Sequence, residues 1–154
     1  MPEKKTLERA RRDKVEGKSA STQAGEFVRE EMEHIRSGKH GARNTKQAIA
    51  IGLSKARRAG VDLKPPKKGK AKESTRKSAE RDYRKGHSAK KKSTSSKRSS
   101  SRLKALKREP RSAASHSALS RQAKSAARAR RKRGSVTAGA RRSSGARASQ
   151  RKAA

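Results

Sequence analysis

The sequence of 154 residues has no cysteine and no tryptophan, and it has one phenylalanine and one tyrosine. Without cysteine the chain has no disulfide framework and no thiolate metal site. Hydrophobic residues make up 27% of the chain, and no apolar run approaches the roughly 18 residues that a membrane-spanning helix needs. The first residues, MPEKKTLERARRDK, lack the apolar segment of a secretory signal. We therefore expect a cytoplasmic protein that does not bind membranes.

Acidic residues are also scarce. The chain has 13 Asp and Glu against 47 Lys and Arg, which gives a formal net charge of +34 at pH 7. Low hydrophobicity with high net charge is typical of disordered chains, because too little apolar surface is buried to offset the ordering entropy. Such an excess of cations calls for an anionic partner, with nucleic acid first and anionic lipid second.

The charge divides unevenly along the chain. Residues 1–63 contain 15 Lys and Arg and 9 Asp and Glu, whereas residues 64–154 contain 32 and 4. Pro65 and Pro66 stop any preceding helix and favour an extended path. We place the boundary here and predict three parts. They are a small helical module at 1–63, a basic Lys/Ser-rich linker at 64–100, and a basic Ala/Arg/Ser-rich tail at 101–154.

The clearest predicted helix covers about residues 22–36. Its apolar residues recur at helical spacing and form a narrow stripe, which Phe27 flanks. The stripe consists of Ala24, Val28, Met32 and Ile35. The glutamates of REEMEH lie mostly off the stripe, as on an exposed acidic helix face. This face could dock the basic tail or the SKARRAG end of the next helix, and charge balance within the helix pair is the simpler interpretation.

A second strong helix is predicted over about residues 45–59. Asn44 and Gln47 have capping-box spacing at its start, and Gly60 matches a Schellman ending. Gly52 lies on its apolar face, where a missing side chain would permit close approach of another helix.

A weaker helix precedes these two, with Thr6 as its N-cap and Gly17 as its stop. The predicted fold class is therefore mainly α: a small helical hairpin or three-helix module followed by a largely disordered basic tail. A domain of about 60 residues is marginal by itself. A homodimer through the front helical module, or the binding of a partner, would complete its core.

The tail is of low complexity, and its segments differ. KKKSTSSKRSSSR has no apolar period, whereas SAASHSALSRQAKSAARARRKRG is rich in the helix formers Ala and Arg. Repulsion among the cations opposes a helix in the free chain, and neutralisation by phosphates would allow folding on binding.

Residues 21–60 read STQAGEFVREEMEHIRSGKHGARNTKQAIAIGLSKARRAG. They resemble a bacterial family of small basic proteins that carries an unknown-function domain label. The resemblance rests on the GEFV, GKHG and QAIA segments. It implies a bacterial cytoplasmic protein with a recurring module, and it implies no known activity and no functional residues. The Lys/Ala/Ser/Arg tail is similar in composition to histone H1-like tails of bacterial nucleoid proteins.

The segment HIRSGKHGARNTKQ is a candidate phosphate-binding corner between two helices. Its GKHG loop resembles the GXXG loop that clamps phosphates in KH domains, and a helix N-terminus follows it. Lys39, His40 and Arg43 add positive charge. The simpler interpretation is that its two glycines only end one helix and turn the chain into the next.

The predicted nucleic-acid-binding residues belong to this corner, to the following helix and to the basic tail, which we expect to supply most of the affinity through phosphate contacts of low sequence specificity. They are Lys39, His40, Arg43, Arg57, Arg58, Lys90, Lys91, Lys92, Arg128, Arg130, Arg131, Lys132 and Arg133.

The sequence predicts no metal site, no cofactor and no enzymatic activity. His34 and His40 lie near one another, with Glu30 one turn earlier, but a third well-spaced histidine and cysteine ligands are missing. There is no GxxxxGK[ST] loop, and no Ser/His/Asp arrangement can be argued.

We therefore expect a non-enzymatic, largely sequence-independent DNA-binding protein of nucleoid-associated or histone H1-like type, located in the cytoplasm at the nucleoid. The first alternative is an RNA- or ribosome-associated basic protein. The second is a helical protein-interaction module that a basic tail localises. DNA is the expected partner ahead of RNA.

Overall fold

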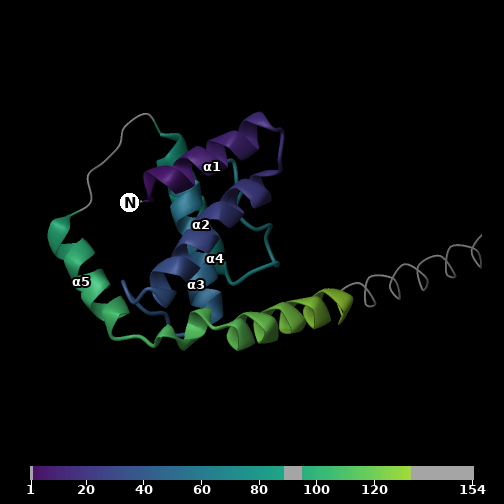
Figure 1. Ribbon diagram of the computed structural model, residues 1–154. Coiled ribbons are helices and arrows are strands. Elements are labelled where there is room, and N and C mark those ends of the chain that lie inside the picture. The colour runs from purple at the N-terminus through teal and green to yellow at the C-terminus, as the bar shows by residue number, and fades with distance from the viewer. Residues whose placement is uncertain (1, 89–94, 133–154) are drawn as a thin grey trace, which may run out of the picture. The chain divides into compact units, whose positions relative to one another are not determined.

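The computed structural model describes residues 2–88 and 95–132 (Figure 1). Within these ranges the chain folds into helices without strands, which confirms the mainly α fold. The elements are α1 (Lys4–Val15), α2 (Ala20–Arg36), α3 (Thr45–Arg58), α4 (Glu73–His87), α5 (Ser96–Lys107) and the short 3₁₀ helix η1 (Arg111–Ala114). The backbone is helical again from residue 116 to residue 132. No helix among the described residues combines the length and apolar character needed to cross a bilayer.

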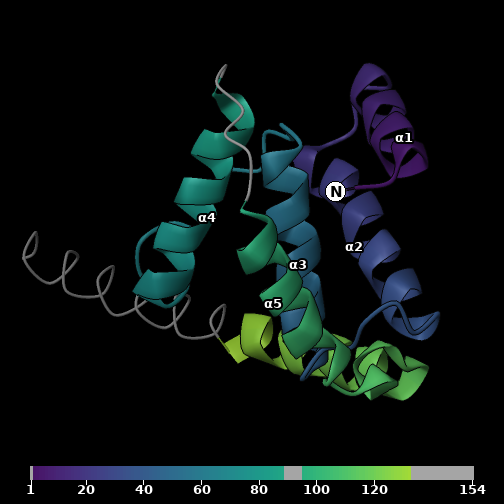
Figure 2. The same ribbon diagram turned by 90° about the vertical axis from the view of Figure 1, so that its left-hand side faces the viewer.

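Residues 1–118 form one compact unit, and the chain from residue 119 belongs to a second. In the first unit α1 packs against α2, α2 against α3, and α3 against α4. Figure 2 shows α3 between α2 and α4. The expected hairpin of α2 and α3 is thus the centre of a larger helical unit.

The helix ends follow local sequence signals in most cases. The Asn44 side chain accepts a hydrogen bond from the Gln47 amide at 2.9 Å, which confirms the expected N-cap of α3. The predicted glycine stops are also present, because the residue after each C-cap has a positive φ that favours glycine. The φ values are 72° at Gly17, 79° at Gly38 and 90° at Gly60.

Two predicted helix starts are wrong. The helix α1 begins three residues after Met1 with Glu3 as N-cap, so that Thr6 lies buried inside the first turn instead of capping it. The helix α2 begins at Ala20, because the Ser19 side chain accepts a hydrogen bond from the amide of Thr22 and thus caps the helix earlier.

The core contains few large side chains. Phe27 and Ile35 on α2 are fully buried, and most of the other buried hydrophobic residues are alanines. Ala24 and Met32 of the predicted stripe are buried as well, whereas Val28 is only partly buried. Phe27, which was expected to flank the stripe, is fully buried as well, because α1 and α3 cover α2 from two sides.

Gly52 sets the separation of α2 and α3. A Cβ atom at this position would lie 2.7 Å from Val28 Cα, so only glycine allows the two backbones to approach this closely. This confirms the predicted role of Gly52 in helix packing.

The helix α4 lies in the segment that the sequence analysis assigned to a linker. Its Asp82 is buried and accepts hydrogen bonds from Ser54 and Arg58 of α3 at 2.7 and 2.8 Å. The neighbouring Tyr83 hydroxyl donates to Asp62. This hydrogen bond lowers the pKa of Asp62 and raises the pKa of Tyr83. Two carboxylates, one in α4 and one in the loop after α3, therefore attach α4 to the front helices.

Replacing Gly52 by Ala should destabilise the protein by about 1–3 kcal/mol, because the added methyl group overpacks the contact between α2 and α3. The matched control is Gly25→Ala in α2, where an added Cβ meets no atom within 4 Å. That change should be neutral or stabilise by up to about 1 kcal/mol through helix propensity. Thermal denaturation of both variants measures the difference, and equal stability of the two would contradict the packing role.

Replacing Tyr83 by Phe should raise the pKa of Asp62 toward its ordinary value, since the hydroxyl donor is removed. A carboxyl whose pKa is lowered in the folded state stabilises it above the unfolded pKa, and this contribution is lost as the pH falls through the folded value. Side-chain NMR titration measures the shift. Glu73, whose pKa Arg76 lowers, is the internal control, and its titration should not move.

Candidate functional site

The GKHG loop between α2 and α3 is covered by the end of α5 and by the segment that joins α5 to η1. The Gly41 amide donates to the Leu106 carbonyl at 2.9 Å, and the Ala42 amide donates to the Pro110 carbonyl at 3.0 Å. A Cβ atom at Gly41 would collide with the backbone of Glu109. Both amides are therefore occupied within the chain, and phosphate binding by this loop would have to displace the segment.

The same cover continues through η1. The Thr45 hydroxyl donates to the Ala113 carbonyl at 2.7 Å, and Arg36 Nε donates to the Ala114 carbonyl at 2.9 Å. Both alanines are buried. Residues 2–88 and 106–114 thus form one packed structure, which extends well past the predicted boundary at residue 63.

The exposed cations of the corner face carboxylates. Lys39 Nζ lies 2.9 Å from Glu3 Oε1, and His34 Nε2 lies 2.8 Å from the same oxygen. The hydrogen bonds from Lys39 and then from His34 lower the pKa of Glu3 to about 2. Arg43 is exposed, with its Nε 3.9 Å from Glu109 Oε1.

His40 lies inside the fold, where it meets a buried carboxylate. Its Nε2 is 3.1 Å from Oε1 of Glu31, which is fully buried. On the other side Lys55 Nζ lies 2.6 Å from Glu31 Oε2 and 3.5 Å from Glu30 Oε1. The contacts among Glu30, Glu31, His40 and Lys55 define what we call the buried ionic cluster.

The prediction of an exposed acidic face on α2 is wrong for its two central glutamates. Glu30 and Glu31 are buried because α2 is flanked by α1 and α3, and only Glu33 of the REEMEH glutamates is exposed. The cation that pairs with them is Lys55, from the SKARRAG end of α3. The structure therefore agrees with the simpler of the two interpretations, in which the glutamates of α2 balance charge within the helix pair.

The two predicted arginines of α3 are also engaged within the fold. Arg57 is buried, donates from Nε to the Leu63 carbonyl at 3.1 Å, and has its pKa lowered by burial. Arg58 is half-exposed and pairs with Asp82 at 2.8 Å. These interactions fix the α3–α4 junction.

The predicted residues of the tail differ from those of the front. Lys90, Lys91, Lys92 and Arg133 lie outside the described residues. Four others lie exposed on the helix at 116–132, namely Arg128, Arg130, Arg131 and Lys132.

The helix at 116–132 also carries two exposed cations that the prediction left out, Arg121 and Lys124. With Arg128 and Arg131 they recur at spacings of three and four, which places the four within about 80° of arc. We call these four residues the cationic stripe. Helical spacing in the sequence is the signal that would have found them. Arg130 falls on another side of the helix.

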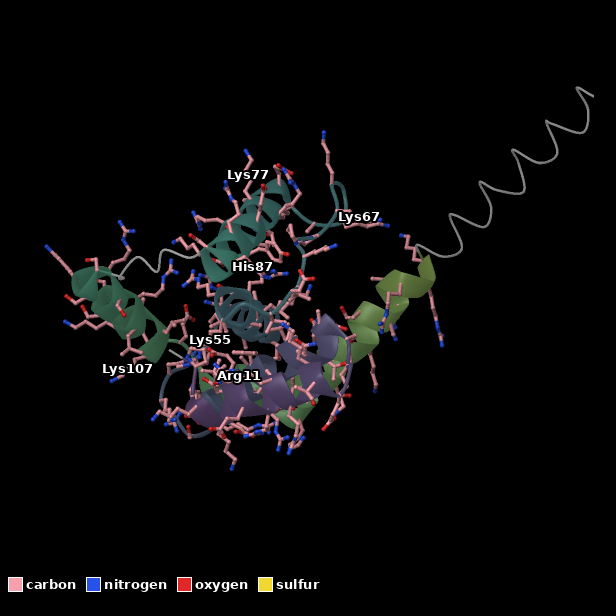
Figure 3. The ribbon with its side chains drawn as sticks, turned by 90° about the horizontal axis from the view of Figure 1, so that it is seen from above. Arg11, Lys55, Lys67, Lys77, His87 and Lys107 are labelled. Atoms are coloured by element: carbon pink, nitrogen blue, oxygen red, sulfur yellow. The ribbon has the colours of Figure 1, made fainter. Side chains whose placement is uncertain are left out.

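No acidic residue follows Glu109 in the sequence. The cations of α5 are exposed, and α5 has no acidic residue either. Figure 3 shows Lys67 and Lys77 extending away from the ribbon, as expected for solvated cations. Some cations thus hold the front fold together, whereas others, including Lys67, Lys77 and those of α5, face solvent.

Replacing Lys55 by Met should destabilise the protein by about 3 kcal/mol, because the buried carboxylates of Glu30 and Glu31 would be left without their ammonium partner. Lys46→Met, at an exposed position of the same helix, is the control and should change stability by less than about 0.5 kcal/mol. Urea denaturation measures both. A Lys55→Met protein as stable as the control would mean that the buried ionic cluster does not hold the fold.

Comparison with known proteins finds a similarity for the front part of the sequence. No curated protein and no solved structure matches the chain. Residues 11–69 match the model of DUF6496, a family of unknown function, which confirms the unknown-function domain label expected for the front module.

Proposed function

We propose that this protein is a non-enzymatic, largely sequence-independent DNA-binding protein of nucleoid-associated, histone H1-like type. The observation that carries the proposal is the cationic stripe on the helix at 116–132, in a stretch of sequence without acidic residues. Lys and Arg side chains that neutralise phosphates release condensed counterions, which is the main source of sequence-independent affinity.

The partners of the front cations support an assignment of DNA binding to the tail and not to the front unit. Lys39, His40 and Arg58 each lie within ion-pair distance of a carboxylate, so phosphate binding there would break an existing interaction. The cationic stripe has no carboxylate on its own helix to compete with phosphate. We therefore assign most of the affinity to the tail, and a positioning or protein-binding role to the front unit.

The scarcity of aromatic side chains supports binding without base stacking. Base edges are read mainly by bidentate Arg, Asn and Gln contacts within an element seated in a groove, and single-stranded bases are read by stacking on aromatic rings. The chain has one Phe, buried in the core, and one Tyr, bonded to Asp62. Phosphate binding remains as the dominant interaction.

Bacterial origin, a location at the nucleoid and a homodimer through the front module belong to this proposal. RNA is the competing partner, because a phosphate-binding helix accepts either backbone. Competition between duplex DNA and RNA of equal length decides between them. Preferential displacement of bound DNA by RNA would favour the ribosome-associated alternative.

The full chain should bind a fluorescent DNA duplex with an affinity that falls steeply with salt. Replacing Arg121, Lys124, Arg128 and Arg131 by Gln should reduce the log–log salt slope by about 0.9 for each phosphate that is no longer neutralised, or about 3.6 for all four. Fluorescence anisotropy at several salt concentrations measures the slope.

The control variant removes the same number of charges from exposed positions of α1, by Gln substitution of Lys4, Lys5, Arg11 and Lys14. It should change the slope by much less. Equal effects of the two variants would show that total charge, and not the cationic stripe, governs binding. Binding that does not depend on salt would refute the proposed function.

A further inference from the structure

Three potential metal ligands meet beside the GKHG loop. One ligand atom from each of Glu31, His34 and His40 lies within 4.8 Å of the other two. Glu31 and His34 are three residues apart on α2, the Glu-x-x-His spacing by which helices present a carboxylate and an imidazole to a shared ion. His40 reaches the same place from the loop, with its ring edge-on to His34 at a centroid distance of 6.1 Å.

The orientation of His40 is suited to a ligand. Its Nδ1 lies 3.1 Å from the Gly41 carbonyl oxygen, which accepts a hydrogen bond only if Nδ1 carries a proton. Such a hydrogen bond from the second ring nitrogen is the usual support of a metal-binding histidine. The Nε2 atom, then an acceptor, lies 3.1 Å from Glu31 Oε1, and no hydrogen bond joins the two atoms. Two acceptors in this arrangement repel each other unless a proton or a metal ion lies between them.

The carboxylate oxygens beside His40 and Lys55 accept no well-aligned hydrogen bond from the described part of the chain. Both oxygens of Glu31 and Oε1 of Glu30 are buried and accept no hydrogen bond among the described residues. Lys55 supplies charge at 2.6 Å from Glu31 Oε2 but is shared with Glu30. Burial of a carboxylate without hydrogen bonds costs free energy. A cation or a hydrogen-bond donor beside Glu31 Oε1 would therefore stabilise the folded state.

The local charge also favours a bound cation. Around the two imidazoles lie the carboxylates of Glu3, Glu30 and Glu31 and the ammonium groups of Lys39 and Lys55. With neutral imidazoles this set carries one net negative charge in a chain whose formal net charge is +34. The rest of the surface repels cations, so a divalent ion that binds one-to-one to this protein needs a built site of this kind.

We propose that Glu31, His34 and His40 form a site for one divalent transition-metal ion, with zinc preferred. Two imidazoles and one carboxylate are a ligand set that zinc accepts, whereas magnesium and calcium prefer oxygen ligands alone. The site would join α2 to the loop that residues 106–114 cover, and would thus stabilise the corner of the fold. It does not depend on the proposed DNA binding. The spacing of the histidines in the sequence does not predict this site, because its third ligand is a glutamate that only the fold buries.

The test titrates the full chain, free of nucleic acid, with Co²⁺ as a spectroscopic probe and with Zn²⁺ in a calorimeter. We expect one Co²⁺ per chain with absorption bands of a site of low coordination number, and displacement of Co²⁺ by Zn²⁺. Mg²⁺ should not compete. Absence of one-to-one binding by either transition metal overturns the proposal.

The variants use all four histidines of the chain. His34→Asn combined with His40→Asn should abolish the one-to-one binding. His87→Asn combined with His116→Asn, at two exposed positions, should retain it. Retained binding in the first variant, or loss in the second, overturns the assignment.

Because the first variant could fail to fold, NMR of the unmodified protein provides a second measurement. Zn²⁺ should shift the imidazole signals of His34 and His40 and leave those of His87 and His116 in place. Binding that shifts the His87 or His116 signals instead overturns the proposal whatever the state of the variant.

Discussion

The fold depends on a buried carboxylate, Glu31, which ties three segments together. Its two oxygens lie beside Lys55 of α3 and His40 of the loop, while its own backbone belongs to α2. An ionised group in a low-dielectric interior is tolerated only with opposite charge close by, so the positions of these three segments are coupled. The core around it is small and rich in alanine, so charge pairing contributes to specificity where apolar packing is thin.

The few acidic residues occupy the junctions of the structure. Glu3 holds the start of α1 near the loop, Glu30 and Glu31 join α2 to α3, and Asp82 joins α3 to α4. Glu3, Glu31 and Asp82 each contact two partner residues, so that these carboxylates connect separate segments of the chain. Beyond the last carboxylate no such tie point exists, and the cations of the helix at 116–132 are directed to solvent. This is the physical basis for separating a packed front unit from the tail to which we assign phosphate binding.

Sequence reasoning identified features that depend on a few neighbouring residues. The Asn44 cap, the glycine stops and the close approach at Gly52 were all predicted, because capping and helix spacing are local properties. It missed the burial of Glu30 and Glu31 and the interior placement of His40 and Arg57. A charged residue in an amphipathic helix is assigned to solvent by default, and only the neighbours that cover it decide otherwise.

The sequence by itself determined the helical class, the N-cap of α3, the glycine stops of the helices and the excess of positive charge toward the C-terminus, since these follow from composition and short-range hydrogen bonding. The tertiary structure decided which cations are available. It enclosed His40 and Arg57, paired Lys55 with buried carboxylates, and used residues 106–114 to cover the loop that the sequence offered as a phosphate site. The reason is physical: availability depends on long-range packing and on the scarce carboxylates, whose positions in space are set by the fold.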